Sequence, residues 1–105
     1  MSAYMVVLAR DVVADGWEAY QSKVADCIAS FGGRYLARRV PAEVLEGEFP
    51  YQRITCFIFP DMSSIRDFWR SNEYQRTIKP LREGLGYLDI WAVPGIEVTD
   101  QEVQV

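Results

Sequence analysis

The alternation of strand-like and helix-like segments constrains the fold of this chain more than any other feature. Segments rich in β-branched and aromatic residues, which are typical of strands, occupy 3–12, 34–40, 51–59 and 86–93. Apolar residues at spacings of three and four, which indicate amphipathic helices, occupy 17–31 and, in two parts, 64–69 and 71–85. The order βαββαβ predicts an α+β, ferredoxin-like fold, in which both helices cover one face of an antiparallel sheet.

Local signals mark where the helices should begin and end. Asp15 is expected to cap the first helix, and Gly32–Gly33 should end it because glycine accepts a left-handed turn. Ser64 begins a capping-box pattern, and Ser71 is expected to cap the next helical segment. Pro80 should kink that segment, since proline has no N–H to donate.

The length of the chain, 105 residues, suits one domain. We expect that domain to span 1–95, with 96–105 as an acidic tail that is either frayed or packed on a partner subunit. No apolar run approaches the roughly 18 residues of a membrane span, and no signal peptide is evident. The predicted location is cytoplasmic.

Composition restricts the chemistry. The chain has no histidine, the commonest general base near neutral pH and a frequent metal ligand. Cys27 and Cys56 have no metal-binding spacing, so each is expected to be a small buried hydrophobe. We therefore predict neither a bound metal nor a cofactor. A net charge of −4 argues against nucleic acid as a partner.

Alternation along the strands divides the sheet into two faces. One face, expected to lie under the helices, carries Met5, Val7, Ala9, Ile54, Cys56, Ile58, Leu88, Ile90 and Ala92. The other is predicted to carry Tyr4, Val6, Leu8, Arg10, Arg53, Thr55, Phe57, Phe59, Tyr87, Asp89, Trp91 and Val93. That second face is too apolar for water. It predicts a homodimer in which two sheets pack face to face around an aromatic cavity for a small molecule.

Three blocks of the sequence, "GGRYLARR", "VLEGEFPYQRITCFIFPD" and "FWRSNEYQRTIKPLR", resemble the domain-of-unknown-function family 1330. Its members belong to the dimeric α+β barrel superfamily, with the antibiotic-biosynthesis monooxygenases and muconolactone isomerases. The positions that match the family pattern are Gly32, Gly33, Arg34, Arg38, Glu46, Gly47, Arg53, Phe59, Pro60, Ser71, Glu73, Tyr74 and Arg82. Arg39 and Val40 stand where the family usually has two glycines. The resemblance implies the fold and the dimer, but no activity.

Arginines are the first candidates for the site. Arg38 is predicted to be catalytic, because a guanidinium fits a carboxylate or enolate with two parallel hydrogen bonds; the other interpretation is a charge that protects a sheet edge. Arg39, Arg53 and Tyr35 are predicted to bind substrate. Strand parity leaves open which of Arg34, Arg38 and Arg39 point inward, because a bulge would exchange them.

Three polar residues complete the predicted catalytic set. Asp89 is either a general base raised by apolar surroundings or the partner of Arg53 in a buried ion pair. Asn72 and Tyr74 could donate hydrogen bonds to a substrate carbonyl or its developing oxyanion. Tyr74 also begins an apolar stripe, so core packing is its other interpretation.

Three aromatic residues are predicted to bind the substrate by stacking. Trp69, Trp91 and Phe57 either stack on a planar ligand or fill the core.

Two functions remain open from the sequence. The first is a cofactor-independent enzyme that oxygenates, isomerises or cyclises a small anionic or polyketide-like aromatic compound. The second is a non-catalytic dimer that binds a ligand or has a structural role.

Overall fold

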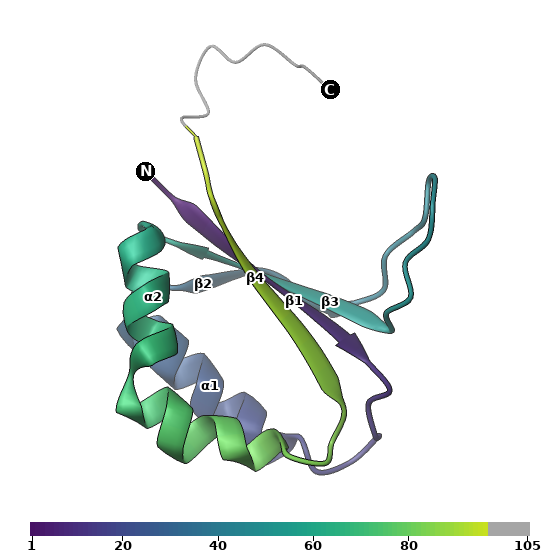
Figure 1. The fold of residues 1–105 in the computed structure, drawn as a ribbon, viewed down its shortest axis with the longest axis horizontal. Coiled ribbons are helices and arrows are strands. Elements are labelled where there is room, and N and C mark those ends of the chain that lie inside the picture. Colours follow the sequence, from purple (N-terminus) through teal and green to yellow (C-terminus); the bar gives the residue numbers. More distant parts are fainter. Residues whose placement is uncertain (97–105) are drawn as a thin grey trace.

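The computed structural model describes residues 1–96, and the predicted tail from 97 onward lies outside them. The strands are β1 (Ala3–Arg10), β2 (Arg34–Val40), β3 (Arg53–Phe59) and β4 (Tyr87–Pro94). The helical segments are α1 (Glu18–Ser30), α2 (Met62–Arg70), a π-helix (Glu73–Ile78) and a 3-10 helix (Lys79–Arg82). The sheet has the order β2-β3-β1-β4 with antiparallel neighbours, and the helices lie on one side of it (Figure 1). The predicted α+β, ferredoxin-like fold is confirmed.

The predicted end of α1 is confirmed, but its predicted cap is wrong. Gly32 has φ +85°, and its N–H donates to the carbonyl of Ala29 at 3.0 Å. This left-handed turn satisfies a carbonyl that would otherwise lack a partner at the helix end. At the other end α1 begins at Glu18, and no side chain caps it, so Asp15 does not have the predicted role.

The second helical region begins one turn earlier than the capping box predicts. Asp61 caps α2 and accepts hydrogen bonds from the Ser64 N–H at 2.7 Å and from the Ser64 hydroxyl at 2.8 Å. The predicted role of Ser71 is confirmed, since its hydroxyl accepts from the Tyr74 N–H at 3.2 Å. Helix geometry then changes at Lys79, one residue before Pro80, which cannot donate to the helix.

The register of β3 corrects the predicted faces of the sheet. Met5 pairs with Phe57, so Phe57 shares the helix-covered face with Met5. Phe57 and Phe59 are accordingly core residues, 4% and 1% exposed. Ile54, Cys56 and Ile58 lie on the opposite face, which we call the open face. Alternation within each strand was predicted correctly. Which face of a strand meets the helices depends on its pairing with the neighbouring strand, and the sequence does not reveal this when both faces of the strand are apolar.

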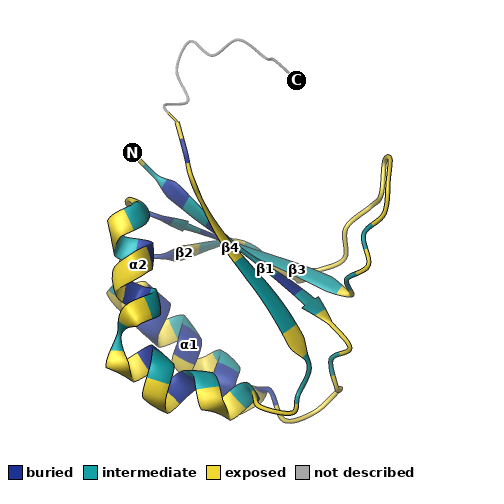
Figure 2. Ribbon diagram, viewed as in Figure 1, coloured by how far each residue is buried: buried dark blue, intermediate teal, exposed yellow. Residues whose placement is uncertain are grey.

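The core fills the space between the helices and the sheet, where Figure 2 shows the buried segments. Its buried members are Ala3, Met5, Trp17, Tyr20, Val24, Cys27, Ile28, Phe57, Phe59, Ile65, Phe68, Tyr74 and Ile78. Cys27 is buried as predicted, whereas Cys56 is only half-buried; both are free thiols. None of the helices within residues 1–96 has the length and apolar character needed to cross a membrane.

The open face and the segment between β2 and β3 expose large apolar side chains. Trp91 is 56% and Val93 45% exposed on the open face. Residues 41–52, which we call the arm, contain no strand and project away from the helices (Figure 1). Leu45 in the arm is 91% exposed. The arm is therefore an exposed extension between β2 and β3.

Candidate ligand-binding cavity

A cavity of about 80 Å³ lies between the helix-covered face of the sheet and α1. A water molecule needs about 10–15 Å³ by a comparable measure, so several would fit. Five of the predicted site residues line this cavity, namely Tyr35, Arg39, Arg53, Phe57 and Tyr74. This hollow lies within one chain, whereas the sequence predicted a site between the sheets of two subunits, and that inter-subunit site stays a prediction. The inverted phase of β3 carries Arg53 and Phe57 to the helix side.

A bulge in β2 decides which arginine reaches the cavity. The pairing of β2 with β3 shifts register between Tyr35 and Ala37 and again before Val40. Arg39 sits in the second shift with φ +46°, and its N–H donates to the Thr55 hydroxyl at 3.0 Å. Position 39 thus has a left-handed backbone, which glycine adopts most readily, although an arginine occupies it.

Arg38, the first candidate from the sequence, is not among the residues that line the cavity. Its guanidinium carbon lies 4.1 Å from the centre of the Tyr35 ring, a cation–π contact. Arg38 is exposed at the sheet edge. Its observed role therefore fits the edge-charge interpretation, with the added contribution of holding one wall residue of the cavity.

Two guanidinium groups mark the mouth of the cavity. Arg39 is exposed and Arg53 is half-buried, and both line the hollow. Within residues 1–96 the ion pairs involve only Arg10, Asp11 and Asp89, so neither cavity arginine is neutralised by a carboxylate there. No Asp or Glu lines the cavity. The mouth consequently favours an anion.

Two tyrosine hydroxyls meet in the buried part of the lining, which we call the closed end. The Tyr20 and Tyr74 hydroxyl oxygens lie 3.1 Å apart, and the two residues are 7% and 0% exposed. Burial, together with the neighbouring Tyr74, raises the pKa of Tyr20 far above its ordinary value, so the Tyr20 phenol is neutral at physiological pH. Tyr74 is a core residue, as its packing interpretation predicts, and its role as a hydrogen-bond donor to a substrate stays a prediction.

The guanidinium of Arg82 lies beside this tyrosine pair, 5.8 Å from the centre of the Tyr20 ring. Burial lowers the pKa of Arg82, but hydrogen bonding and charge interactions with Tyr74 and Tyr20 outweigh it and the net pKa is raised. Tyr20 was assigned only to an apolar stripe, and Arg82 only to a family pattern. The signal that could have identified them is a polar tip on an otherwise apolar helix face.

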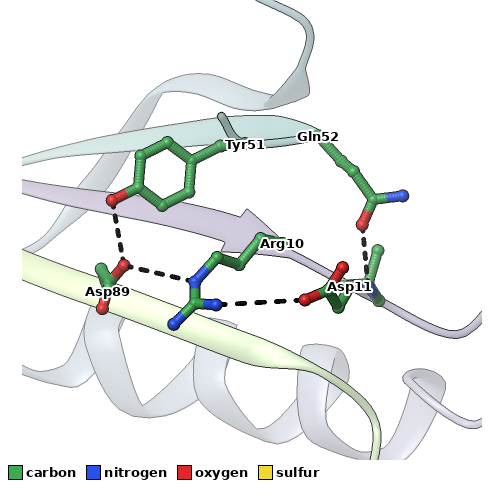
Figure 3. Close-up of polar contacts among 6 residues, drawn as sticks. Arg10, Asp11, Tyr51, Gln52 and Asp89 are labelled. Carbon is green, nitrogen blue, oxygen red and sulfur yellow. Dashed lines mark hydrogen bonds and ion pairs between the residues drawn. The ribbon is translucent and has the colours of Figure 1, made fainter. Parts of the chain in front are cut away.

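Asp89 lies on the open face and cannot act in this cavity. Its carboxylate accepts a hydrogen bond from the Tyr51 hydroxyl at 3.0 Å and lies 3.9 Å from the Arg10 guanidinium (Figure 3). The hydrogen bond to Asp89 raises the pKa of Tyr51. The predicted Asp89–Arg53 ion pair is wrong, since the two residues lie on opposite faces. Figure 3 also shows Gln52, whose side-chain oxygen accepts a hydrogen bond from the backbone N–H of Val12 at 2.8 Å.

The remaining predicted residues lie outside the cavity. Asn72 is exposed next to the π-helix. Trp69 and Trp91 line a second hollow of about 300 Å³ between α2 and β4, which we call the groove. Met5 and Ile90 line both hollows and so form the wall between them. The structure therefore separates the predicted aromatic set, with Phe57 in the cavity and the two tryptophans at the groove.

Within residues 1–96 no group of three or more Asp, Glu or Cys side chains is placed to hold a metal ion. The guanidinium and phenol groups that line the cavity can bind an anion and donate hydrogen bonds, and its aromatic side chains can enclose a ring.

Comparison with solved structures supports the fold. The RPA0582 protein of unknown function from Rhodopseudomonas palustris has a TM-score of 0.65 and 13% identity, over 91% of this chain and 83% of that one. A mutant of SnoaB, a cofactor-independent oxygenase from Streptomyces nogalater, has a TM-score of 0.55 and 14% identity, over 95% of this chain and 98% of that one. No curated protein matches the chain.

The profile of one family, described as a domain of unknown function, DUF1330, matches residues 2–96. That match covers the whole βαββαβ unit, including both mouth arginines, the tyrosine pair and Arg82. It confirms the resemblance seen in the three sequence blocks. The chain belongs to the DUF1330 family.

Proposed function

We propose that this protein binds a small anionic molecule with a planar ring in the cavity, and that it does so as a homodimer joined through the open face. The observation that carries the proposal is the pair of guanidinium groups, Arg39 and Arg53, at the mouth of an otherwise apolar hollow with no carboxylate in its lining. An arginine pair with no carboxylate partner among residues 1–96 suits a ligand that brings its own negative charge.

The walls support a planar ligand. The rings of Tyr35 and Phe57 lie 4.6 Å apart, tilted by 34°, and both line the cavity. Aromatic walls with a few convergent polar groups are usual for small-molecule sites. A ring held between these side chains would place its carboxylate or phenolate toward Arg39 and Arg53.

The open face supports the homodimer. Trp91 and Val93 expose much of their side chains there, and Ile54, Cys56 and Ile58 are only half-buried. An apolar surface of this kind marks an association site, and tryptophan is frequent among residues that dominate such interfaces. A second copy presents the same surface, so a twofold interface would cover both.

For the reaction, we propose oxygenation, isomerisation or cyclisation of the bound anion without a cofactor. The chain shares its fold with an enzyme named as a cofactor-independent oxygenase. A guanidinium that holds an enolate or phenolate serves each of these reactions. A non-catalytic ligand-binding or structural dimer is the second candidate. It is favoured by one observation: no Asp or Glu lines the cavity, so no ordinary general base is at hand.

Calorimetric titration with benzoate and with benzamide tests the binding proposal. Benzamide has nearly the same shape but no charge, so we expect benzoate to bind about tenfold or more tightly. Arg39→Met and Arg53→Met should each remove most of that preference. Arg76→Met, which removes an exposed charge from the π-helix, is the matched control and should leave it unchanged. Equal binding of the two probes, or a preference that survives both cavity substitutions, would refute the proposal.

A further inference from the structure

The hydrogen-bond inventory of the tyrosine pair at the closed end of the cavity is incomplete. Each phenol carries one proton that it can donate. The bond between the Tyr20 and Tyr74 hydroxyls uses one of the two protons. Among the described residues, no carbonyl, carboxylate or amide oxygen accepts the other. The second proton is therefore free to be donated to a group in the cavity, which both tyrosines line.

The charged neighbour of this pair cannot accept that proton. Arg82 has only donors on its guanidinium. Its Nε is buried and has no hydrogen-bond partner in residues 1–96. A positive group beside the two phenols instead favours a negatively charged group nearby. The closed end therefore presents one phenolic donor and a positive field, both suited to an electron-rich oxygen.

We propose that the tyrosine pair donates its second proton to a carbonyl or enolate oxygen of the ligand, with Arg82 as a positioning residue behind the pair. This inference rests on the proposed function and narrows the ligand to a cyclic keto acid or its enol. The carboxylate lies at the exposed mouth with Arg39 and Arg53. The ketone oxygen lies at the buried end with Tyr20 and Tyr74.

The arrangement separates two recognition tasks in one hollow. The arginines at the mouth bind a permanent negative charge. The tyrosine pair at the closed end donates a hydrogen bond to an oxygen that is more basic in the enolate than in the ketone. A phenolic donor strengthens its bond as the acceptor gains negative charge. The tyrosine pair would thus hold an enolate more tightly than the ketone.

Calorimetric titration with a matched pair of acids tests the inference. The probes are 4-oxocyclohexane-1-carboxylate and cyclohexane-1-carboxylate, which differ only in the ketone oxygen. We expect the wild-type protein to bind the keto acid about tenfold more tightly. The double variant Tyr20→Phe/Tyr74→Phe should lose that preference and keep its affinity for cyclohexane-1-carboxylate. The single variants show which hydroxyl reaches the ligand, since either remaining phenol still has a proton to donate.

Arg82 has its own readout. Arg82→Met should reduce the preference for the keto acid without changing the affinity for cyclohexane-1-carboxylate, and Arg82→Lys should restore part of it. A residue with a purely structural role would weaken both acids together. Circular dichroism and thermal melting confirm that each variant is folded, and the Tyr→Phe changes preserve the size of the ring.

The outcomes distinguish this inference from the proposed function. Equal affinities for the two acids in the wild type, with both weakened by Arg39→Met, would overturn the inference and leave the proposed function standing. Failure of both acids and of benzoate to bind would overturn both. A neutron structure of the ligand-free protein gives an independent check. A phenolic proton donated to a backbone carbonyl would overturn the inference, whereas one donated to a cavity water would support it.

Discussion

Replacement of Trp91 by alanine is the sharpest test of the homodimer. The Trp91 side chain is 56% exposed on the open face. A tryptophan buries about 200 Å² when it is fully enclosed, so contact with a partner would remove about 110 Å² more from water. At about 25 cal/mol per Å² this amounts to about 3 kcal/mol for each copy. A twofold interface contains the residue twice, which gives an upper value of about 6 kcal/mol.

Part of that free energy is offset by the ordering of side chains on association. We therefore expect Trp91→Ala to weaken the dimer at least a hundredfold, which corresponds to about 3 kcal/mol. Sedimentation equilibrium from nanomolar to high micromolar concentration measures the change. Leu81→Ala is the matched control, because Leu81 is 37% exposed on the 3-10 helix and away from the open face. A wild-type protein that is monomeric at 10–100 μM, on the order of concentrations at which stable dimers persist, would refute the reasoning, as would a Trp91→Ala dimer of unchanged strength.

Three further predictions concern stability and the shape of the cavity. Asp61→Ala should lower the melting temperature, whereas Asp61→Asn, which keeps a capping oxygen, should not. Hydrogen bonds from Ser64 lower the pKa of Asp61. The wild type should therefore melt at a higher temperature than Asp61→Ala near neutral pH, and this difference should fade as the pH falls below about 4. The raised pKa of Tyr51 predicts that its bond to Asp89 stabilises the fold below pH 10 or so and is lost above it, so urea unfolding of Tyr51→Phe should show a smaller decline in stability at high pH than the wild type. Met5→Ala should join the cavity to the groove, lower the free energy of unfolding by about 2–4 kcal/mol and allow 2-naphthoate to bind. Met5→Leu, the control, should cost less than about 1.5 kcal/mol and leave the wall closed. Binding of 2-naphthoate to the wild type as tightly as to Met5→Ala would contradict this.

The order of elements could be predicted because helical and strand periodicities are local properties of the sequence. Gly32 and Ser71 marked ends that the structure confirms, for the same local reason. The phase of β3 could not be predicted in this way. Both faces of β3 are apolar, with Phe57 and Phe59 on one and Ile54 and Ile58 on the other, so only the pairing with β1 decides which face meets the helices.

The site depended on that phase and on a bulge. Arg53 lies on the helix-covered face because of the register of β3, whereas Asp89 lies on the face that was predicted for it, away from the cavity. Arg39, not Arg38, lines the cavity, and it lies at the second of two register shifts between β2 and β3, which strand alternation does not reveal. Tyr20 was counted with its apolar neighbours, since a stripe of helix spacing does not distinguish a phenol that packs from one whose hydroxyl also meets a second tyrosine 54 residues later.

At position 39 the backbone conformation favours glycine, whereas the proposed anion site requires the charge of an arginine. An L-residue with a side chain adopts this region at a cost of about 1 kcal/mol that glycine avoids. Selection for thermal stability alone would therefore favour glycine or asparagine at position 39, and the positive charge would be lost. Retention of the arginine in directed evolution for heat resistance, despite that pressure, would be a genetic sign that the charge serves the organism.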